Sequence, residues 1–156
     1  MKNFFFIQVI FLFLLTNCGF KVINQNLTRN FDIAEIETSG NSRVNYFIKN
    51  RILLGSKNSE KKLIKLKLNT KKEKIIKEKN IKNEVTKYKL NIIAYVNLYL
   101  IAEDKSFDFS ISESGEFSVK SIHSKTIFNE KKTLKTISES IGDKIIEELI
   151  VVLNDL

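Results

Sequence analysis

The sequence predicts a two-layer α+β sandwich, in which two helices pack on one face of a roughly four-stranded sheet. Three observations lead to this fold class. Long stretches of the chain alternate apolar and polar residues with a period of two, which is typical of half-buried strands. Two other stretches carry apolar residues three or four positions apart, which is typical of amphipathic helices. The 156-residue chain is long enough for one such domain with a single core.

The chain opens with a short basic and apolar segment that predicts an export signal. Lys2 precedes residues 4–15, an apolar stretch in which only Gln8 is polar. A membrane-spanning helix needs about 20 apolar residues, so this stretch is too short for a permanent span. Residues 1–17 therefore fit a signal peptide, and the chain's only cysteine, Cys18, stands at the expected cleavage site.

The position of Cys18 predicts a bacterial lipoprotein with covalent lipid on this residue. A disulfide would need a second molecule, and a catalytic thiol would need a nearby histidine, whereas His123 is the only one and lies far along the chain. A buried structural cysteine does not fit a cleavage site. Asn17 stands where a lipobox usually has Gly, Ala or Ser, so an uncleaved N-terminal anchor is the alternative. Because Gly19 rather than Asp follows Cys18, we expect the protein on the periplasmic side of the outer membrane.

The part of the chain after the signal begins with a polar connection. Residues 18–30 are interpreted as a lipidated tether, and residues 31–156 as a single domain. The Phe- and Ile-rich residues 31–38 predict the first strand of this domain.

A helix is predicted directly after this strand. Asn41 or Ser42 is a suitable N-cap, and the apolar residues of positions 43–54 recur at helical spacing. Gly55 is placed to end the helix.

Two further strands are predicted in the middle of the chain. Residues 62–69 alternate apolar residues with lysines, which indicates a half-buried strand. Residues 71–83 are dense in charge and leave two alternatives open, an extension of this strand or a loose helical turn. From Thr86 to Leu100 the alternation lasts longest, and apolar residues on both sides of this strand indicate a central place in the sheet.

The last predicted elements are a strand and a long helix. Residues 102–106 predict a hairpin turn, and residues 107–119 predict a strand in which Gly115 marks a bulge or bend. A terminal helix is expected over residues 128–153, with Asn129 as its N-cap. Its apolar stripe comprises Leu134, Ile137, Ile141, Ile145, Leu149 and Val152.

With both helices on one face of the sheet, the other face is left uncovered. An ordinary solvated face is one interpretation. The other is a basic and aromatic surface for an anionic amphiphile or a larger protein. The candidate amphiphile contacts are Lys65, Lys67, Lys87 and Lys89, and the candidate protein-partner positions are Ile93, Tyr95 and Tyr99.

Charge and composition argue against other function classes. The net charge of +8 favours polyanionic partners, and export makes nucleic acid an unsuitable one. The sequence shows no glycine-rich phosphate loop and no cluster of metal-ligating residues. We therefore expect a protein that is not an enzyme and takes no cofactor or metal, the alternative being a periplasmic enzyme whose site the sequence does not reveal.

Three features in fixed order carry a family resemblance. Cys18-Gly19-Phe20 directly follows the signal, the helix of residues 43–54 follows an early strand, and Thr-Lys-Tyr-Lys-Leu-Asn-Ile at residues 86–92 opens the longest strand before a closing helix. In this order and spacing, the whole chain resembles the lipopolysaccharide-assembly lipoprotein family LptE, in its alphaproteobacterial branch.

The resemblance implies a specific role. Members of the LptE family plug the outer-membrane barrel LptD, help it to fold and bind lipopolysaccharide, and the lipidated cysteine of the family corresponds to Cys18. No family motif aligns with the single lysines, so lipopolysaccharide contacts at Lys65, Lys67, Lys87 and Lys89 follow from strand geometry alone. The alternative function is a free-standing envelope lipoprotein that binds anionic lipid or polymer.

Overall fold

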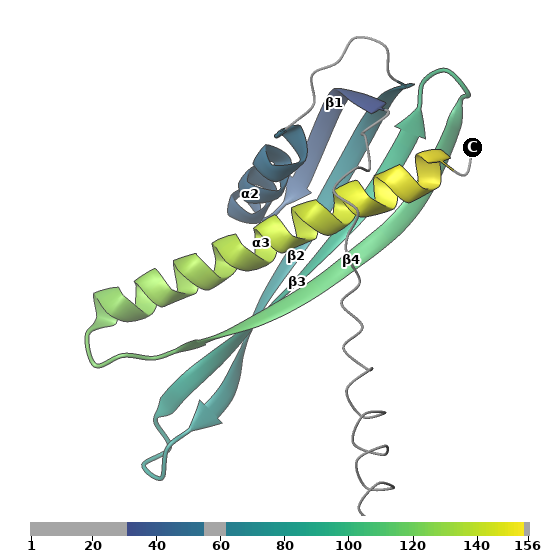
Figure 1. Cartoon of the computed structure of the whole chain (residues 1–156). Coiled ribbons are helices and arrows are strands. Elements are labelled where there is room, and N and C mark those ends of the chain that lie inside the picture. Colours follow the sequence, from purple (N-terminus) through teal and green to yellow (C-terminus); the bar gives the residue numbers. More distant parts are fainter. Residues whose placement is uncertain (1–30, 55–61, 155–156) are drawn as a thin grey trace, which may run out of the picture.

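The computed structural model describes residues 31–54 and 62–154 (Figure 1). The predicted signal peptide, Cys18, the tether and the helix-ending Gly55 lie outside these residues.

The described residues form two layers, a sheet and a pair of helices on one of its faces (Figure 1). This arrangement confirms the predicted α+β sandwich. The long C-terminal helix runs obliquely across the strands, and the shorter helix lies beside it (Figure 1). In chain order the elements are β1 (Phe31–Gly40), α2 (Ser42–Leu53), β2 (Lys62–Lys79), β3 (Val85–Leu100), β4 (Lys105–Ser118) and α3 (His123–Asn154).

The sheet is mixed and follows the chain order β1-β2-β3-β4. β1 pairs with β2 in parallel, with α2 as the connecting helix, whereas β2, β3 and β4 are antiparallel neighbours. β3 therefore has a central place, as its two-sided apolar pattern predicts.

The core lies between the sheet and the helices. The even-numbered residues of β2 from Ile64 to Thr70, and those of β3 from Leu90 to Leu100, are buried beneath the helices. The predicted stripe of α3 meets them, with Ile141, Ile145 and Leu149 fully buried and only Val152 half-buried. The two apolar periodicities of the sequence thus converge on one core.

Two local predictions, for residues 71–83 and for Gly115, need completion or correction. Residues 71–79 continue β2, so the strand alternative holds for this charged segment. Gly115 causes no bulge, because β4 pairs with β3 without a register shift. A Cβ at Gly115 would instead lie 2.8 Å from the Ile137 Cδ1 atom, so this glycine lets α3 approach the sheet.

The start of α3 also differs from the prediction. The helix begins at His123, five positions before the expected start, and Asn129 lies inside it. The Asn129 side chain donates a hydrogen bond to the Ser118 carbonyl oxygen and thereby ties the helix to the end of β4.

A buried polar network fixes the turn between β1 and α2. Asn41 is the N-cap, its side chain accepting a hydrogen bond from the Val44 N–H. The buried Thr70 hydroxyl donates to Asn45 Oδ1 at 2.7 Å, and Asn45 Nδ2 donates to the Ser39 carbonyl oxygen at 2.9 Å. These bonds connect β1, α2 and β2 at one point.

We expect Thr70→Val to lower the free energy of unfolding by about 1–3 kcal/mol, since it removes the hydroxyl donor and leaves the buried Asn45 oxygen unsatisfied. Chemical denaturation monitored by circular dichroism measures the change. Thr38→Val, at an exposed position of β1, is the matched control and should leave stability within about 0.5 kcal/mol of the native chain. Equal stability of Thr70→Val and the native chain would contradict the structural role of the network.

Candidate functional site

The uncovered face of the sheet is the candidate site. Side chains alternate across a strand, so the residues between the buried positions of β2 and β3 all point away from the helices. We call this surface the open face. It comprises Glu35, Glu37 and Ser39 of β1, Lys65, Lys67, Asn69 and Lys71 of β2, Lys89, Asn91, Ile93, Tyr95, Asn97 and Tyr99 of β3, and Ser106, Asp108, Ser110, Ser112 and Ser114 of β4.

Two of the four candidate lysines are paired with acidic residues of β1. Lys65 Nζ lies 3.0 Å from Glu35 Oε2, and Lys67 Nζ lies 3.4 Å from Glu37 Oε2. The hydrogen bond and charge of Glu35 raise the pKa of the Lys65 ammonium group. These two lysines therefore have much of their charge compensated within the chain.

The other two candidate lysines lie nearer the β2–β3 turn. Lys87 Nζ contacts Glu78 Oε1 at 2.8 Å, and this hydrogen bond raises the pKa of Lys87. Lys89, half-buried, forms no ion pair with any residue of the described ranges. The structure thus does not bring the four lysines together as one cationic cluster.

The candidate partner residues differ in exposure. Tyr95 is 42% exposed, with Lys71 Nζ 5.4 Å from the centre of its ring. Ile93 and Tyr99 are half-buried. The Tyr99 hydroxyl donates a hydrogen bond to Asp104 Oδ1 at 2.8 Å, which raises the pKa of the phenol. Tyr95 is therefore the aromatic ring that the open face presents most directly to a partner.

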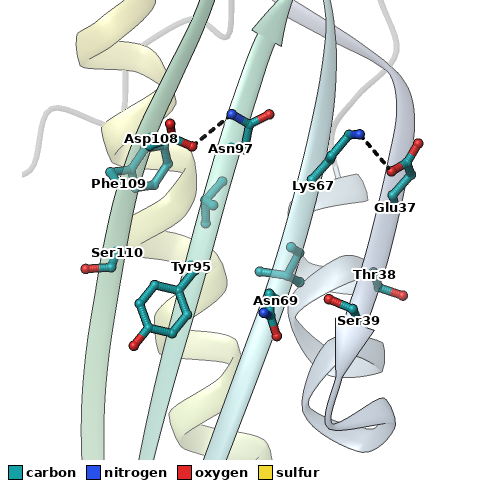
Figure 2. Close-up of a pocket in the computed structure, with 12 residues that line it drawn as sticks. Glu37, Thr38, Ser39, Lys67, Asn69, Tyr95, Asn97, Asp108, Phe109 and Ser110 are labelled. Carbon is teal, nitrogen blue, oxygen red and sulfur yellow. Dashed lines mark hydrogen bonds and ion pairs between the residues drawn. The ribbon is translucent and has the colours of Figure 1, made fainter.

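A shallow depression of about 530 Å³ is lined by Tyr95 and by residues of all four strands. Figure 2 shows these residues, with the helices behind the strands. Its lining combines apolar surface, from Val96 and Phe109 for example, with amide and hydroxyl groups such as those of Asn69 and Ser110. The ion pair of Lys67 and Glu37 lies at one end. Asn97 Nδ2 donates to Asp108 Oδ1 at 2.8 Å beside that pair. Such a surface combines exposed apolar area with amide and hydroxyl groups that can form hydrogen bonds.

Sequence reasoning missed the acidic half of this face. Glu35 and Glu37 alternate with the half-buried Ile36, and this short pattern is the local signal of two carboxylates on one side of β1. Their pairing with Lys65 and Lys67 depends on the parallel register of β1 and β2, which the local pattern does not contain.

Two kinds of feature are absent from the described residues. No group of three or more His, Cys, Asp or Glu side chains in residues 31–54 and 62–154 could hold a metal ion. Among the helices of the same ranges, none is long and apolar enough to cross a membrane.

No protein-family model matches the sequence, and no curated protein matches it significantly. Several solved structures do resemble this one. A protein described as a lipoprotein from Caulobacter crescentus has a TM-score of 0.59 at 15% identity, with 77% of this chain and 90% of that chain covered.

Two other solved lipoproteins give the same TM-score. Rare lipoprotein B from Shewanella oneidensis matches at 0.59 and 12% identity over 78% of this chain and 97% of that chain. Lipoprotein B from Nitrosomonas europaea matches with a TM-score of 0.59 and 16% identity over 87% of this chain and 93% of that chain. At such low identities the likeness is one of fold. The described domain therefore shares the fold of these bacterial lipoproteins over most of its length.

Proposed function

We propose that the protein is an envelope lipoprotein, anchored to the outer membrane through lipid on Cys18, whose domain serves as the plug and assembly partner of an LptD-like barrel. In this role it takes part in delivering lipopolysaccharide to the cell surface and catalyses no reaction. The proposal combines the export signal, the resemblance to the LptE family and a fold shared with solved bacterial lipoproteins.

The open face is the observation that supports this proposal best. The lumen of a membrane barrel is polar and filled with water, so a plug needs a surface that is stable in water and still able to form many hydrogen bonds. The ion pairs of Lys65 and Lys67 and the amides around Tyr95 meet both needs. A partly exposed tyrosine in such surroundings is also typical of protein interfaces.

The alternative, anion binding on the open face of a free-standing lipoprotein, is less well supported. Lys65 and Lys67 each have a carboxylate partner within 3.4 Å, and an anion would have to displace it. The barrel partnership needs no free cation there.

Affinity purification of the full chain from detergent-solubilised outer membranes tests the proposal. We expect a large barrel protein to co-purify in a near-equal amount, with mass spectrometry identifying it. Depletion of the protein should also reduce lipopolysaccharide at the cell surface. Recovery of the chain alone, under conditions that keep barrel complexes intact, would rule out the plug role and favour a free-standing lipoprotein.

A further inference from the structure

The β2–β3 hairpin extends beyond the rest of the domain. β1 ends its pairing with β2 at Thr70, while β2 and β3 continue to the turn between Lys79 and Val85 (Figure 1). We call residues 71–89 the arm. The last residue of β4 pairs with Lys87, so the tip of the arm stands clear of β1 and β4.

Most of the chain's net charge is concentrated on the arm. It carries eight lysines and three glutamates, a net charge of +5, while the whole chain carries +8. Some of these lysines are paired; for example, Lys74 Nζ lies 2.7 Å from Glu130 Oε2. Lys71, Lys79, Lys82 and Lys89 form no ion pair within the described parts of the chain. The electrostatic potential around the arm is therefore positive.

An aliphatic side chain stands at the tip of this cationic arm. Ile81 is 104% exposed. Ile75 and Ile76, which lie in β2 before the tip, are 41% and 49% exposed. A fully exposed isoleucine buries no apolar surface in the folded domain and so does not stabilise it. Its position, between Lys79 and Lys82, combines apolar surface with positive charge on both sides.

The turn that presents Ile81 is held in place by hydrogen bonds. Asn80 Oδ1 accepts from the N–H groups of Lys82 and Glu84 at 2.9 and 3.0 Å, and Asn80 Nδ2 donates to Glu84 Oε2 at 2.8 Å. Lys79 Nζ donates to Asn83 Oδ1 at 2.8 Å, where Asn83 adopts a left-handed φ of 63°. Ile81 is thus presented outward by an ordered turn.

We propose that the tip of the arm is a docking site for an anionic phospholipid bilayer, with Ile81 entering the interface and Lys79 and Lys82 lying among the phosphate groups. Apolar residues flanked by basic ones bind such surfaces through combined burial and charge attraction. Long lysine side chains can reach the phosphates while an aliphatic neighbour is buried. One projecting side chain needs no complementary pocket, which favours a fluid surface over a protein partner. This inference goes beyond the barrel partnership and does not depend on it.

The natural chain contains no tryptophan, so a single substitution supplies a site-specific probe. Full-length Ile81→Trp is reconstituted into vesicles of phosphatidylcholine alone or with phosphatidylglycerol, and its tryptophan emission is recorded with and without brominated acyl chains. We expect a shift to shorter wavelength and quenching with phosphatidylglycerol only. Tyr46→Trp, at a 62%-exposed position on α2, is the matched control and should respond to neither lipid.

Charge reversal in the probe background tests the role of the lysines. Lys79→Glu with Lys82→Glu should lower the quenched fraction at least about fivefold, since each basic residue near an anionic surface contributes roughly a fivefold factor. Unchanged emission of Ile81→Trp in both lipids would overturn the proposal, as would equal quenching in both or at Tyr46→Trp. A response that requires added lipopolysaccharide or an envelope protein would overturn it as well. Because the chain is tested without a barrel, failure leaves the plug proposal unaffected.

Discussion

Replacement of Gly40 with alanine is expected to lower the free energy of unfolding by about 2–5 kcal/mol. Gly40 ends β1 with φ of +89°, a conformation that costs a side-chain-bearing residue about 1–2 kcal/mol. A Cβ atom there would lie 2.1 Å from the Thr70 carbonyl oxygen and 2.9 Å from its nitrogen. Because both neighbours are backbone atoms, β1 and β2 must separate, and overpacking of this kind costs about 1–3 kcal/mol more.

The same shift should disturb the polar network beside it, since Asn41 N–H donates to both the carbonyl and the hydroxyl oxygen of Thr70. Thermal unfolding measures the effect, with a fall in Tm of about 2–4 °C for each kcal/mol in a domain of this size.

Gly115→Ala is the matched control for this variant. Its Cβ would also meet an atom at 2.8 Å, but that atom is the end of the Ile137 side chain, which can rotate away. Gly115→Ala should therefore destabilise the domain much less than Gly40→Ala. Equal loss of stability in the two variants would show that the backbone contact at Thr70 is not the cause.

The two layers of this fold are predictable from the sequence, because burial of one face gives each strand and helix a regular spacing of apolar residues. Ile64 to Leu68 and Leu90 to Leu100 alternate since one side of each strand faces the helices, and the stripe of α3 repeats at helical spacing for the same reason. Where burial is absent the period disappears. Residues 71–79 of β2 are exposed on both faces, so their charged sequence is compatible with either a strand or a helix.

Features that join distant residues were not predictable from local patterns. Gly115 suggested a bulge, yet its role depends on Ile137, which approaches it from a different layer. Lys65 and Lys67 suggested a cationic surface, but the parallel register with β1 places Glu35 and Glu37 beside them. The basic and aromatic residues of the open face were thus predictable, whereas its acidic residues and its charge balance required the structure.

Tyr95→Asp is expected to reduce recovery of the barrel partner at least about thirtyfold while leaving the stability of the isolated domain nearly unchanged. Tyr95 is 42% exposed at the centre of the open face and would be covered in a complex. Loss of an aromatic anchor at an interface costs about 2 kcal/mol or more, which corresponds to this factor. A carboxylate buried without a partner adds a further penalty. Quantitative mass spectrometry of the affinity-purified chain measures the change.

Tyr46→Asp provides the matched control for this effect. Tyr46 is 62% exposed on α2, and its ring makes an edge contact with the Phe47 ring, with 5.4 Å between the ring centroids. It lies in the helix layer, so the same substitution should preserve barrel recovery. Loss of recovery in Tyr46→Asp but not in Tyr95→Asp would place the partner on the helices instead. Of the two tyrosines, only Tyr95 lies on the open face. An equal loss in both variants would therefore indicate a general effect of added negative charge.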